Sequence, residues 1–235
     1  MSTNRRFFNL TAWGYDFITR QDVWRTQIEA TLSFIDRPER IEHIIDLGCG
    51  PGISSFVLAE RLPDASILGV DISDQMIHRA RRHHQRHYSH LNNLEFTRCD
   101  VYDLPFETAS FDLAIGHSFL YLLPDRGGAL AAIRRILANG GRLVLMEPNA
   151  QGSLREALQT MPRTPLVRAP ISTTRFATSM LLWQLVSRTR GRISPDKLRE
   201  LFEQASMEDV IVRPTLHGLG LHATGCRGVS CPDER

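Results

Sequence analysis

The chain has 235 residues, 42% of them hydrophobic and 23% charged, a composition typical of a globular protein that buries one core. Its formal net charge is only +2, which argues against a dedicated nucleic-acid-binding protein, because such proteins have a larger basic surplus. The longest apolar stretch, residues 176–186, is about half as long as a membrane-spanning helix, and the N-terminal residues lack a signal-peptide pattern. We therefore predict a cytoplasmic protein without stable membrane insertion.

Hydrophobic spacing predicts alternating helices and strands. Apolar residues at helical intervals between residues 9 and 36 predict helices ahead of the first strand, and we assign residues 1–40 to an N-terminal helical cap. The strands that follow are predicted at 41–47, 65–73, 94–100, 111–118 and 141–147, and the helices between them at 53–61, 74–88 and 126–138. This alternation is typical of a doubly wound parallel sheet with helices on both faces.

The alternation stops after Pro148. Residues 149–193 contain three prolines and an apolar helix candidate at 173–188, and we predict that they form an insertion. The elements that complete the fold are a helix at 195–205 and strands at 209–213 and 218–226. No crossover helix fits between the last two strands, so we predict that they pair antiparallel. Residues 1–235 are thus predicted to form one α/β domain around a doubly wound, seven-stranded, mostly parallel sheet with an antiparallel last strand.

Cysteines and histidines give no metal-site pattern. Cys49 falls in the turn after the first predicted strand and Cys99 at the end of the third, while Cys226 and Cys231 lie near the C-terminal end, and none has the paired spacing of metal ligands. We predict that all four are free thiols. His83 and a second histidine four residues later share one face of a predicted helix, but two imidazoles without a third ligand make a poor zinc site. We expect this helix face to be solvated.

The turn after the first predicted strand has the pattern D-x-G-x-G-x-G, formed by Asp46, Gly48, Gly50 and Gly52. A glycine-rich turn between a strand and its helix places backbone N–H groups around a polar ligand. In the dinucleotide fingerprint G-x-G-x-x-G the third glycine would fall at position 53, which is Ile53. The pattern therefore disfavours a pyrophosphate ligand, and the glycines instead allow the main chain to lie directly against the ligand.

This turn and four later landmarks, in the same order, resemble the class I S-adenosylmethionine-dependent methyltransferases that act on small molecules. The landmarks are Asp71 within GVDIS and the segments 99–115, 111–125 and 137–148. The resemblance covers residues 7–148 well and the C-terminal strands in topology only. It implies a Rossmann-like fold with S-adenosyl-L-methionine as cofactor.

The resemblance also implies roles for individual residues. Asp46 would hold the methionine ammonium, Asp71 the two ribose hydroxyls, and Asp100 the adenine amino group, each in line with the acceptor capacity of a carboxylate. The alternative is that these aspartates only cap helices. The other residues assigned to the cofactor are Tyr15, Arg25, Gly48, Cys49, Gly50, Gly52, Ile72, Met76, Val101, Gly116 and His117.

The chemistry needs few catalytic side chains. In methyl transfer from a sulfonium, the protein supplies positioning and a dry cavity, and a proton acceptor is needed only when the nucleophile is protonated. The catalytic candidates are His117 and Tyr121, at the end of the fourth predicted strand. The alternatives are a hydrogen-bonded core histidine at His117 and simple packing at Tyr121.

The acceptor is expected beneath the insertion at 149–193, because the segment after the fifth strand often covers the acceptor in this fold. From residue 150 to residue 193 there are seven arginines against one acid, Glu156, and arginine suits carboxylates and phosphoryl groups. We predict O-methylation of an acidic compound of the carboxylate or phosphonate type. A solvated basic face, or a surface that touches anionic lipid, is the alternative. The candidate substrate residues are Tyr15, Glu147, Arg168, Arg175, Met180 and Trp183.

Three other functions stay open at this point. A peptide methyltransferase or an N-methyltransferase would use the same cofactor site. A non-catalytic adenosylmethionine-binding regulator would be expected to have a broken glycine turn or no ribose carboxylate, and neither is seen. An aminopropyl transferase would need a second acidic cluster for a polyamine. We expect a small-molecule partner, no nucleic acid, no metal, and a monomer or homodimer.

Overall fold

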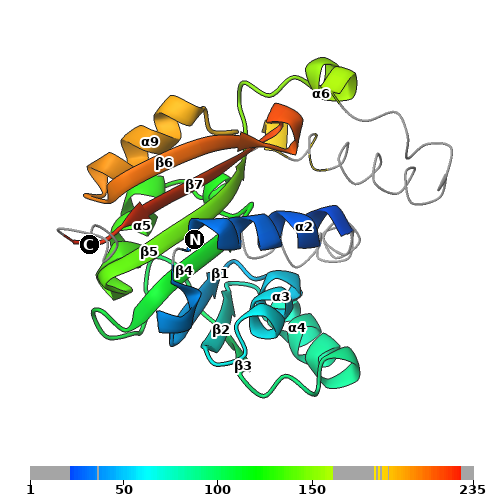
Figure 1. The fold of residues 1–235 in the computed structure, drawn as a ribbon, viewed down its shortest axis with the longest axis vertical. Helices are drawn as coiled ribbons and strands as arrows, with labels where there is room; N and C mark the ends of the chain where they lie inside the picture. Colours follow the sequence, from blue (N-terminus) through cyan, green and yellow to red (C-terminus); the bar gives the residue numbers. More distant parts are fainter. Residues whose placement is uncertain are drawn as a thin grey trace, which may run out of the picture.

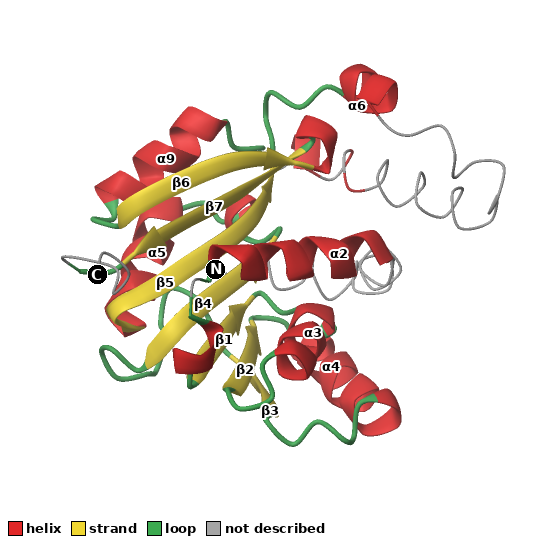
Figure 2. Cartoon of the chain, viewed as in Figure 1, coloured by secondary structure: helices red, strands yellow, loops and turns green. Residues whose placement is uncertain are grey.

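The computed structural model describes residues 22–35, 37–160, 183, 185, 187–189 and 191–228. Seven strands form one central sheet in the order β3-β2-β1-β4-β5-β7-β6, and helices lie on both of its faces (Figures 1 and 2). The predicted α/β fold with a seven-stranded, mostly parallel sheet is confirmed.

The strands up to β5 run parallel. β1 (His43–Leu47) lies between β2 (Ser66–Asp71) and β4 (Phe111–His117). β3 (Leu94–Arg98) pairs with β2, and β5 (Leu137–Pro148) pairs with β4. β1 and β4 are buried along most of their length, as expected for strands covered on both faces. Because these strands are parallel, their carboxyl ends meet at one edge of the sheet.

β5 begins earlier than predicted. The preceding helix, α5 (Arg126–Ile136), ends two residues before the predicted boundary, and the strand starts at once at Leu137. Its register against β4 shifts between Phe111 and Leu113, which pair with Leu137 and Arg142. Residues 139 and 140, which fall between the predicted helix and the predicted strand, thus belong to a bulge within the strand, because a bulge can take up extra residues without ending the pairing.

The last two strands confirm the antiparallel prediction. β7 (Gly220–Cys226) runs antiparallel to β5 on one side and to β6 (Glu208–Thr215) on the other. Cys226 at the end of β7 takes part in a disulfide, whereas Cys49 and Cys99 are free. The prediction of a free thiol at Cys226 is therefore wrong. The absence of metal-ligand spacing says nothing about whether two cysteines can meet in the geometry of a disulfide.

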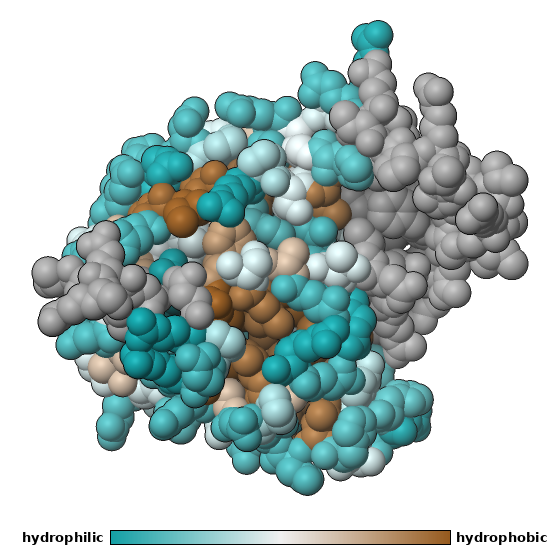
Figure 3. All heavy atoms as spheres, viewed as in Figure 1, coloured by the Kyte–Doolittle hydropathy of each residue, from teal (hydrophilic) through white to brown (hydrophobic). Residues whose placement is uncertain are grey.

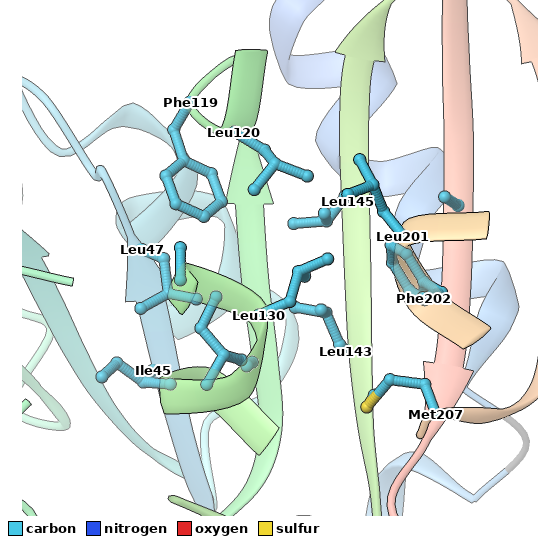
Figure 4. Packing of buried hydrophobic residues seen from close by; sticks show 14 of the residues in the cluster. Ile45, Leu47, Phe119, Leu120, Leu130, Leu143, Leu145, Leu201, Phe202 and Met207 are labelled. Carbon is cyan, nitrogen blue, oxygen red and sulfur yellow. The ribbon is translucent and has the colours of Figure 1, made fainter. Parts of the chain in front are cut away.

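Helices cover the two faces of the sheet with separate core clusters. α5 and α9 (Pro195–Gln204) pack on one face, in the cluster shown in Figure 4. α3 (Ile53–Arg61) and α4 (Asp74–His87) pack on the other face. α2 (Asp22–Thr31) lies over the same face as α3, where its Trp24 contacts a third cluster. On that side, apolar side chains gather at the centre and hydrophilic ones at the rim (Figure 3).

Helix caps fix the chain beside the carboxyl edge of the sheet. The Ser73 hydroxyl accepts the Met76 N–H (3.3 Å) at the start of α4, and the Asp125 carboxylate accepts the Gly128 N–H (2.8 Å) at the start of α5. Such side chains satisfy backbone donors that the first turn of a helix leaves free. Both helices therefore begin at defined positions: α4 shortly after β2 ends at Asp71, and α5 after the longer turn that follows β4.

The predicted insertion leaves the fold and rejoins it at one place. Asn149 and Ile193 form an isolated bridge, and the Ala150 N–H donates to the Ile193 carbonyl (2.9 Å). α6 (Leu154–Thr160) follows this junction, and residues 161–182 lie outside the described part of the chain. No helix in the described ranges has the length and apolarity that crossing a membrane requires.

Candidate active site

A cavity of about 640 Å³ lies at the carboxyl ends of β1 and β2. The strand order runs from β1 to β2 and β3 on one side and to β4 and β5 on the other, so the cavity lies at the topological switch point, where open α/β sheets bind ligands. The predicted cofactor residues that line it are Gly48, Gly50, Asp71, Ile72, Met76, Asp100 and Val101.

The turn after β1 needs its glycines. Gly48, Gly50 and Gly52 have φ values of 65°, 53° and 94°, in the left-handed region that residues with a Cβ rarely adopt. A Cβ added to Gly48 would lie 2.8 Å from the Phe119 Cβ, and one added to Gly52 would lie 2.8 Å from the ring of Phe96. The main chain of this turn therefore packs closely against Phe119 and Phe96. Its glycines place no side chain between the main chain and the cavity.

Asp71 ties this turn to β2. Its Oδ2 accepts the Gly50 N–H (3.0 Å) and its Oδ1 accepts the Ser73 N–H (2.8 Å). Burial raises the pKa of this carboxyl to about 6, and the two N–H donors oppose that rise. A carboxylate has about four lone-pair sites, so two remain for hydroxyl donors from the cavity. This arrangement fits a ribose diol.

The opposite wall is built from residues after β3 and β4. The Asp100 Oδ1 accepts the Tyr102 N–H (3.1 Å), and the Tyr102 hydroxyl accepts the Asp125 N–H (3.1 Å). All three residues line the cavity, together with Phe119 and Leu122. The Tyr102–Asp125 hydrogen bond joins the two loops at this wall. The wall combines apolar side chains with the carboxylates of Asp100 and Asp125, and it could therefore accommodate a flat ring with polar groups at its edge.

Asp46 lies beneath the turn rather than in the cavity wall. Its side chain is 1% exposed, and its Oδ2 accepts the hydroxyls of Ser54 and Ser55, each at 2.5 Å. Its Oδ1 has no hydrogen-bond partner in the described part of the chain, and burial raises the pKa of this carboxyl to about 6. A buried oxygen without a donor is costly, so this atom fits an ammonium reached directly or through water.

A second, small cavity of about 40 Å³ adjoins the first at Gly48. His117 and Cys49 line it, and Trp24 and Trp183 close it from α2 and the insertion, with their rings in edge-to-face contact. The Trp183 Nε1–H donates to the Ser118 hydroxyl (3.1 Å). The insertion, through Trp183, thus contacts the turn after β4 at this second cavity.

His117 is neutral in this setting. Burial, together with the neighbouring His222, lowers the pKa of its imidazole to about 3. Within the described residues neither ring nitrogen of His117 has a hydrogen-bond partner. The imidazole is therefore available to donate one hydrogen bond and accept one, and it is a weak base.

Several predicted residues lie away from both cavities. Arg25 is half-exposed and forms ion pairs with Glu29 (3.7 Å) and Glu60. Tyr121 is buried in the core cluster on the α5 side. Gly116 instead makes room for a ring, because a Cβ there would lie 2.4 Å from Phe119.

Glu147 is also turned away from the cavities, onto the face that α5 covers. Its side chain is fully buried, and its two oxygens accept three backbone N–H groups from the turn after β4. Burial raises the pKa of this carboxyl to about 7. The placement does not support a direct contact with an acceptor, which we predicted from its position at the end of the fifth strand.

The remaining predicted residues, Tyr15, Arg168, Arg175 and Met180, lie outside the described residues. Within the described ranges, no three histidine, cysteine or carboxylate side chains gather in a way that could hold a metal ion. The face of α4 that we predicted to be solvated is partly in contact with the turn after β1, since the His83 Nδ1 lies 3.2 Å from the Pro51 carbonyl oxygen.

Sequence reasoning missed Ser118, Phe119 and Tyr102 as wall residues. The segment 111–125 was singled out, but its motif does not reveal which side chains turn inward. Ser118 has a positive φ of 55°, which reverses the chain just after β4 and directs the next residues over Gly48. A serine at a strand end gives no local signal of such a turn.

Comparisons with known proteins agree with this geometry. A family model described as a methyltransferase domain matches residues 39–206. A trans-aconitate 2-methyltransferase of Methylobacterium radiotolerans is 30% identical over 205 residues, which cover 87% of this chain and 73% of the relative. The aklanonic acid methyltransferase DauC of Streptomyces sp. is 35% identical over 115 residues, 48% of this chain and 51% of the relative.

Solved structures share the fold. The crystal structure of the magnesium protoporphyrin IX methyltransferase of Synechocystis with bound S-adenosylhomocysteine superimposes with a TM-score of 0.63 at 16% identity, over 95% of this chain and 98% of that one. The chain spans about half the length, or less, of several curated relatives that it matches. With the glycine turn, Asp71 and the family-model match together, the chain belongs to the class I S-adenosylmethionine-dependent methyltransferase family.

Proposed function

We propose that this protein is an S-adenosylmethionine-dependent methyltransferase that methylates a small organic acid at a carboxylate oxygen. The observation that supports it most directly is the 640 Å³ cavity at the switch point, in which Asp71 is joined to the bare glycine turn. When bound there, the cofactor supplies an electrophilic methyl group. The chain's own task is to bind, orient and exclude water.

The residues that would hold the cofactor follow from the donors and acceptors present. Asp71 has acceptor capacity left for the ribose hydroxyls, and Asp100 lies at the far wall for the adenine amino group. The free oxygen of Asp46 is buried beneath the turn, where an ammonium would satisfy it. Ile72 and Val101 offer apolar contact to the ring between these polar ends.

Neither His117 nor Glu147 is suited to act as a base, which favours an acceptor that is already ionised. Burial lowers the pKa of His117 to about 3, which makes it a weak base toward an alcohol or an ammonium. The carboxylate of Glu147 is occupied by three N–H groups. A carboxylate acceptor has no proton to lose, so it needs positioning alone. His117 would then donate a hydrogen bond that orients the acceptor.

Two further features support an acidic acceptor. Relatives of this chain include proteins named trans-aconitate 2-methyltransferase and aklanonic acid methyltransferase. Of the seven arginines between residues 150 and 193, Arg155, Arg188 and Arg192 belong to the described residues. Burial, and after it the charge of Arg188, lowers the pKa of Arg192. Residues 1–40 would form the cap and 149–193 the lid of a single domain over this acceptor.

A two-stage experiment tests the proposal. Isothermal titration calorimetry of the purified chain with S-adenosylhomocysteine should give saturable binding, and no heat of binding would refute the cofactor assignment. Labelled adenosylmethionine is then offered with di- and tricarboxylic acids, aromatic acids and the amides of each. Turnover of acids with none on the matched amides is expected, whereas turnover of amines or neutral alcohols alone would refute the acidic acceptor.

A further inference from the structure

Glu147 is a fully buried carboxylate at the end of β5 that touches neither cavity. Its Oε1 accepts the N–H groups of Phe119 (3.2 Å) and Leu120 (2.9 Å), and its Oε2 accepts the N–H of Tyr121 (3.1 Å). Three consecutive backbone donors thus converge on one side chain. Hydrogen bonds to an ionised acceptor are among the stronger ones in proteins.

The segment held in this way is the turn after β4. Ser118 enters it with a positive φ of 55° and donates its N–H to the Met146 carbonyl (2.7 Å). The Arg126 guanidinium then donates to the Tyr121 carbonyl (3.1 Å). Both partners of the turn, Met146 and Glu147, come from adjacent positions of β5. β5 therefore holds both the start of the turn, through Met146, and the three residues that follow, through Glu147.

Phe119 transmits this arrangement to the cofactor cavity. Its ring packs over Gly116, where a Cβ would lie 2.4 Å away, and its Cβ stands against Gly48, where a Cβ would lie 2.8 Å away. Figure 4 shows Phe119 extending toward Leu47 of β1, while Leu120 points toward β5. Phe119, Gly48 and Leu47 all line the 640 Å³ cavity. A shift of the turn would move this wall.

We propose that Glu147 is a positioning residue for the cofactor: by binding the three N–H groups of the turn after β4, it holds Phe119 against the glycine turn and so shapes a wall of the cavity without touching a ligand. The inference rests on the proposed function, since it takes the cavity's occupant to be the adenosyl cofactor. It adds a role for a side chain that lines neither cavity.

A purely structural role explains Glu147 less well. Exchanging buried ionic groups for apolar ones of similar size is often neutral or stabilising, so a buried carboxylate is weak evidence for a contribution to stability. The charged group that acts on Glu147 within the described residues is Arg126, which already bonds to the same turn. The carboxylate and Arg126 thus both act on the turn rather than on the core as a whole.

The test compares two isosteric substitutions in the full chain. Glu147→Gln replaces an accepting oxygen by an NH₂ group that faces backbone donors, so the turn must shift. Asp112→Asn is the matched control: its Oδ2 accepts the N–H groups of Glu42 (3.0 Å) and His43 (2.9 Å) at the other end of β4. Calorimetry with S-adenosylhomocysteine should show a Kd at least tenfold higher for Glu147→Gln and within twofold of wild type for Asp112→Asn.

A double-mutant cycle separates positioning from general destabilisation. Phe119→Leu removes the ring that Glu147 is inferred to hold. If the carboxylate acts through that ring, the effects of the two substitutions on Kd will not add, because the second has little left to disturb. Additive effects on Kd would overturn the inference, as would an unchanged Kd in Glu147→Gln.

Two measurements keep the result interpretable. If wild type does not bind S-adenosylhomocysteine, the proposed function fails; if wild type binds and Glu147→Gln binds equally well, only the present inference fails. Should Glu147→Gln not fold, hydrogen exchange in wild type decides: the amides of Phe119, Leu120 and Tyr121 should exchange as slowly as those of β4. Rapid exchange of all three would overturn the inference.

Discussion

Two turns at the carboxyl edge of the sheet are held by the same device and differ in what they offer a ligand. In the turn after β1, the Gly50 N–H donates to Asp71 at the end of β2. In the turn after β4, three N–H groups donate to Glu147 at the end of β5. Asp71 keeps free acceptor sites beside the cavity, whereas Glu147 is fully committed to the backbone. Asp71 would bind the ligand, and Glu147 would hold the cavity wall formed by the turn after β4.

The largest effect should come from the carboxylate with free acceptor sites. Asp71→Ala removes both the ribose acceptor and the bond to Gly50, and we expect the Kd for S-adenosylhomocysteine to rise about 100-fold, equivalent to roughly 3 kcal/mol. Asp74→Ala serves as the control, since Asp74 is half-exposed and pairs with Arg98 (3.3 Å) outside the cavity. Calorimetry on both variants checks this, and a change of less than fivefold in Asp71→Ala would count against the ribose assignment.

The close contact between β4 and the ring of Phe119, in the turn that follows it, gives the next prediction. Gly116→Ala places a Cβ against the ring of Phe119, at 2.4 Å before relaxation, and overpacking of this kind costs about 1–3 kcal/mol. Urea denaturation should show that loss. Adding Phe119→Leu should restore part of the stability by opening space. A Gly116→Ala protein as stable as wild type would mean that the turn after β4 is looser than described.

Burial of Asp46 and Asp71 predicts that the stability of the ligand-free protein and its affinity for the ligand change with pH in opposite directions. Their folded pKa values of about 6 lie above the ordinary value of 3.8. Between pH 4 and pH 6 the folded chain therefore binds protons that the unfolded chain has released, so the ligand-free stability from these groups falls as pH rises through this window.

The affinity for the ligand should change with pH in the opposite direction. Ribose hydroxyls donate to the ionised form of Asp71 and so favour it, and the affinity for S-adenosylhomocysteine should increase with pH below 6, by up to about tenfold per unit for one proton. Calorimetry at pH 5, 6 and 7 measures this slope. Asp71→Asn should reduce it, and an equal slope in that variant would assign the dependence to other groups.

Local signals predicted the first of the two turns and not the second. The glycine spacing, the carboxylate after β2 and the burial of β1 all lie within short stretches, so Asp71 and the turn could be placed together. The partners of Glu147 are 26 to 28 residues away, and alternation along β5 puts Met146 and Glu147 on opposite faces. Adjacent residues at the end of a strand thus point to different faces of the sheet, and no sequence pattern shows which face Glu147 would take.

The residues around the second cavity could not be predicted from local sequence patterns either, because they come together through contacts between distant segments. Trp183 reaches Ser118 across 65 positions, and Thr215 reaches Gln27 across 188. The apolar spacing of residues 9–36 predicted a helix, and α2 is one, but nothing in that spacing reveals that Trp24 would meet Trp183. The residues proposed for the acceptor depend on such long-range contacts, whereas those proposed for the cofactor lie in one turn and at two strand ends.

The smallest effect should come from Arg25, which the resemblance assigned to the cofactor. Its guanidinium pairs with Glu29 and Glu60, between α2 and α3, and does not line the cavity. Half-exposed ion pairs contribute about 1 kcal/mol or less, so Arg25→Ala should lower the melting temperature slightly and leave the Kd for S-adenosylhomocysteine within twofold. A tenfold rise in Kd with unchanged stability would return Arg25 to the binding site. It would also mean that α2 moves when the ligand binds, because the cavity as described gives this side chain no direct contact.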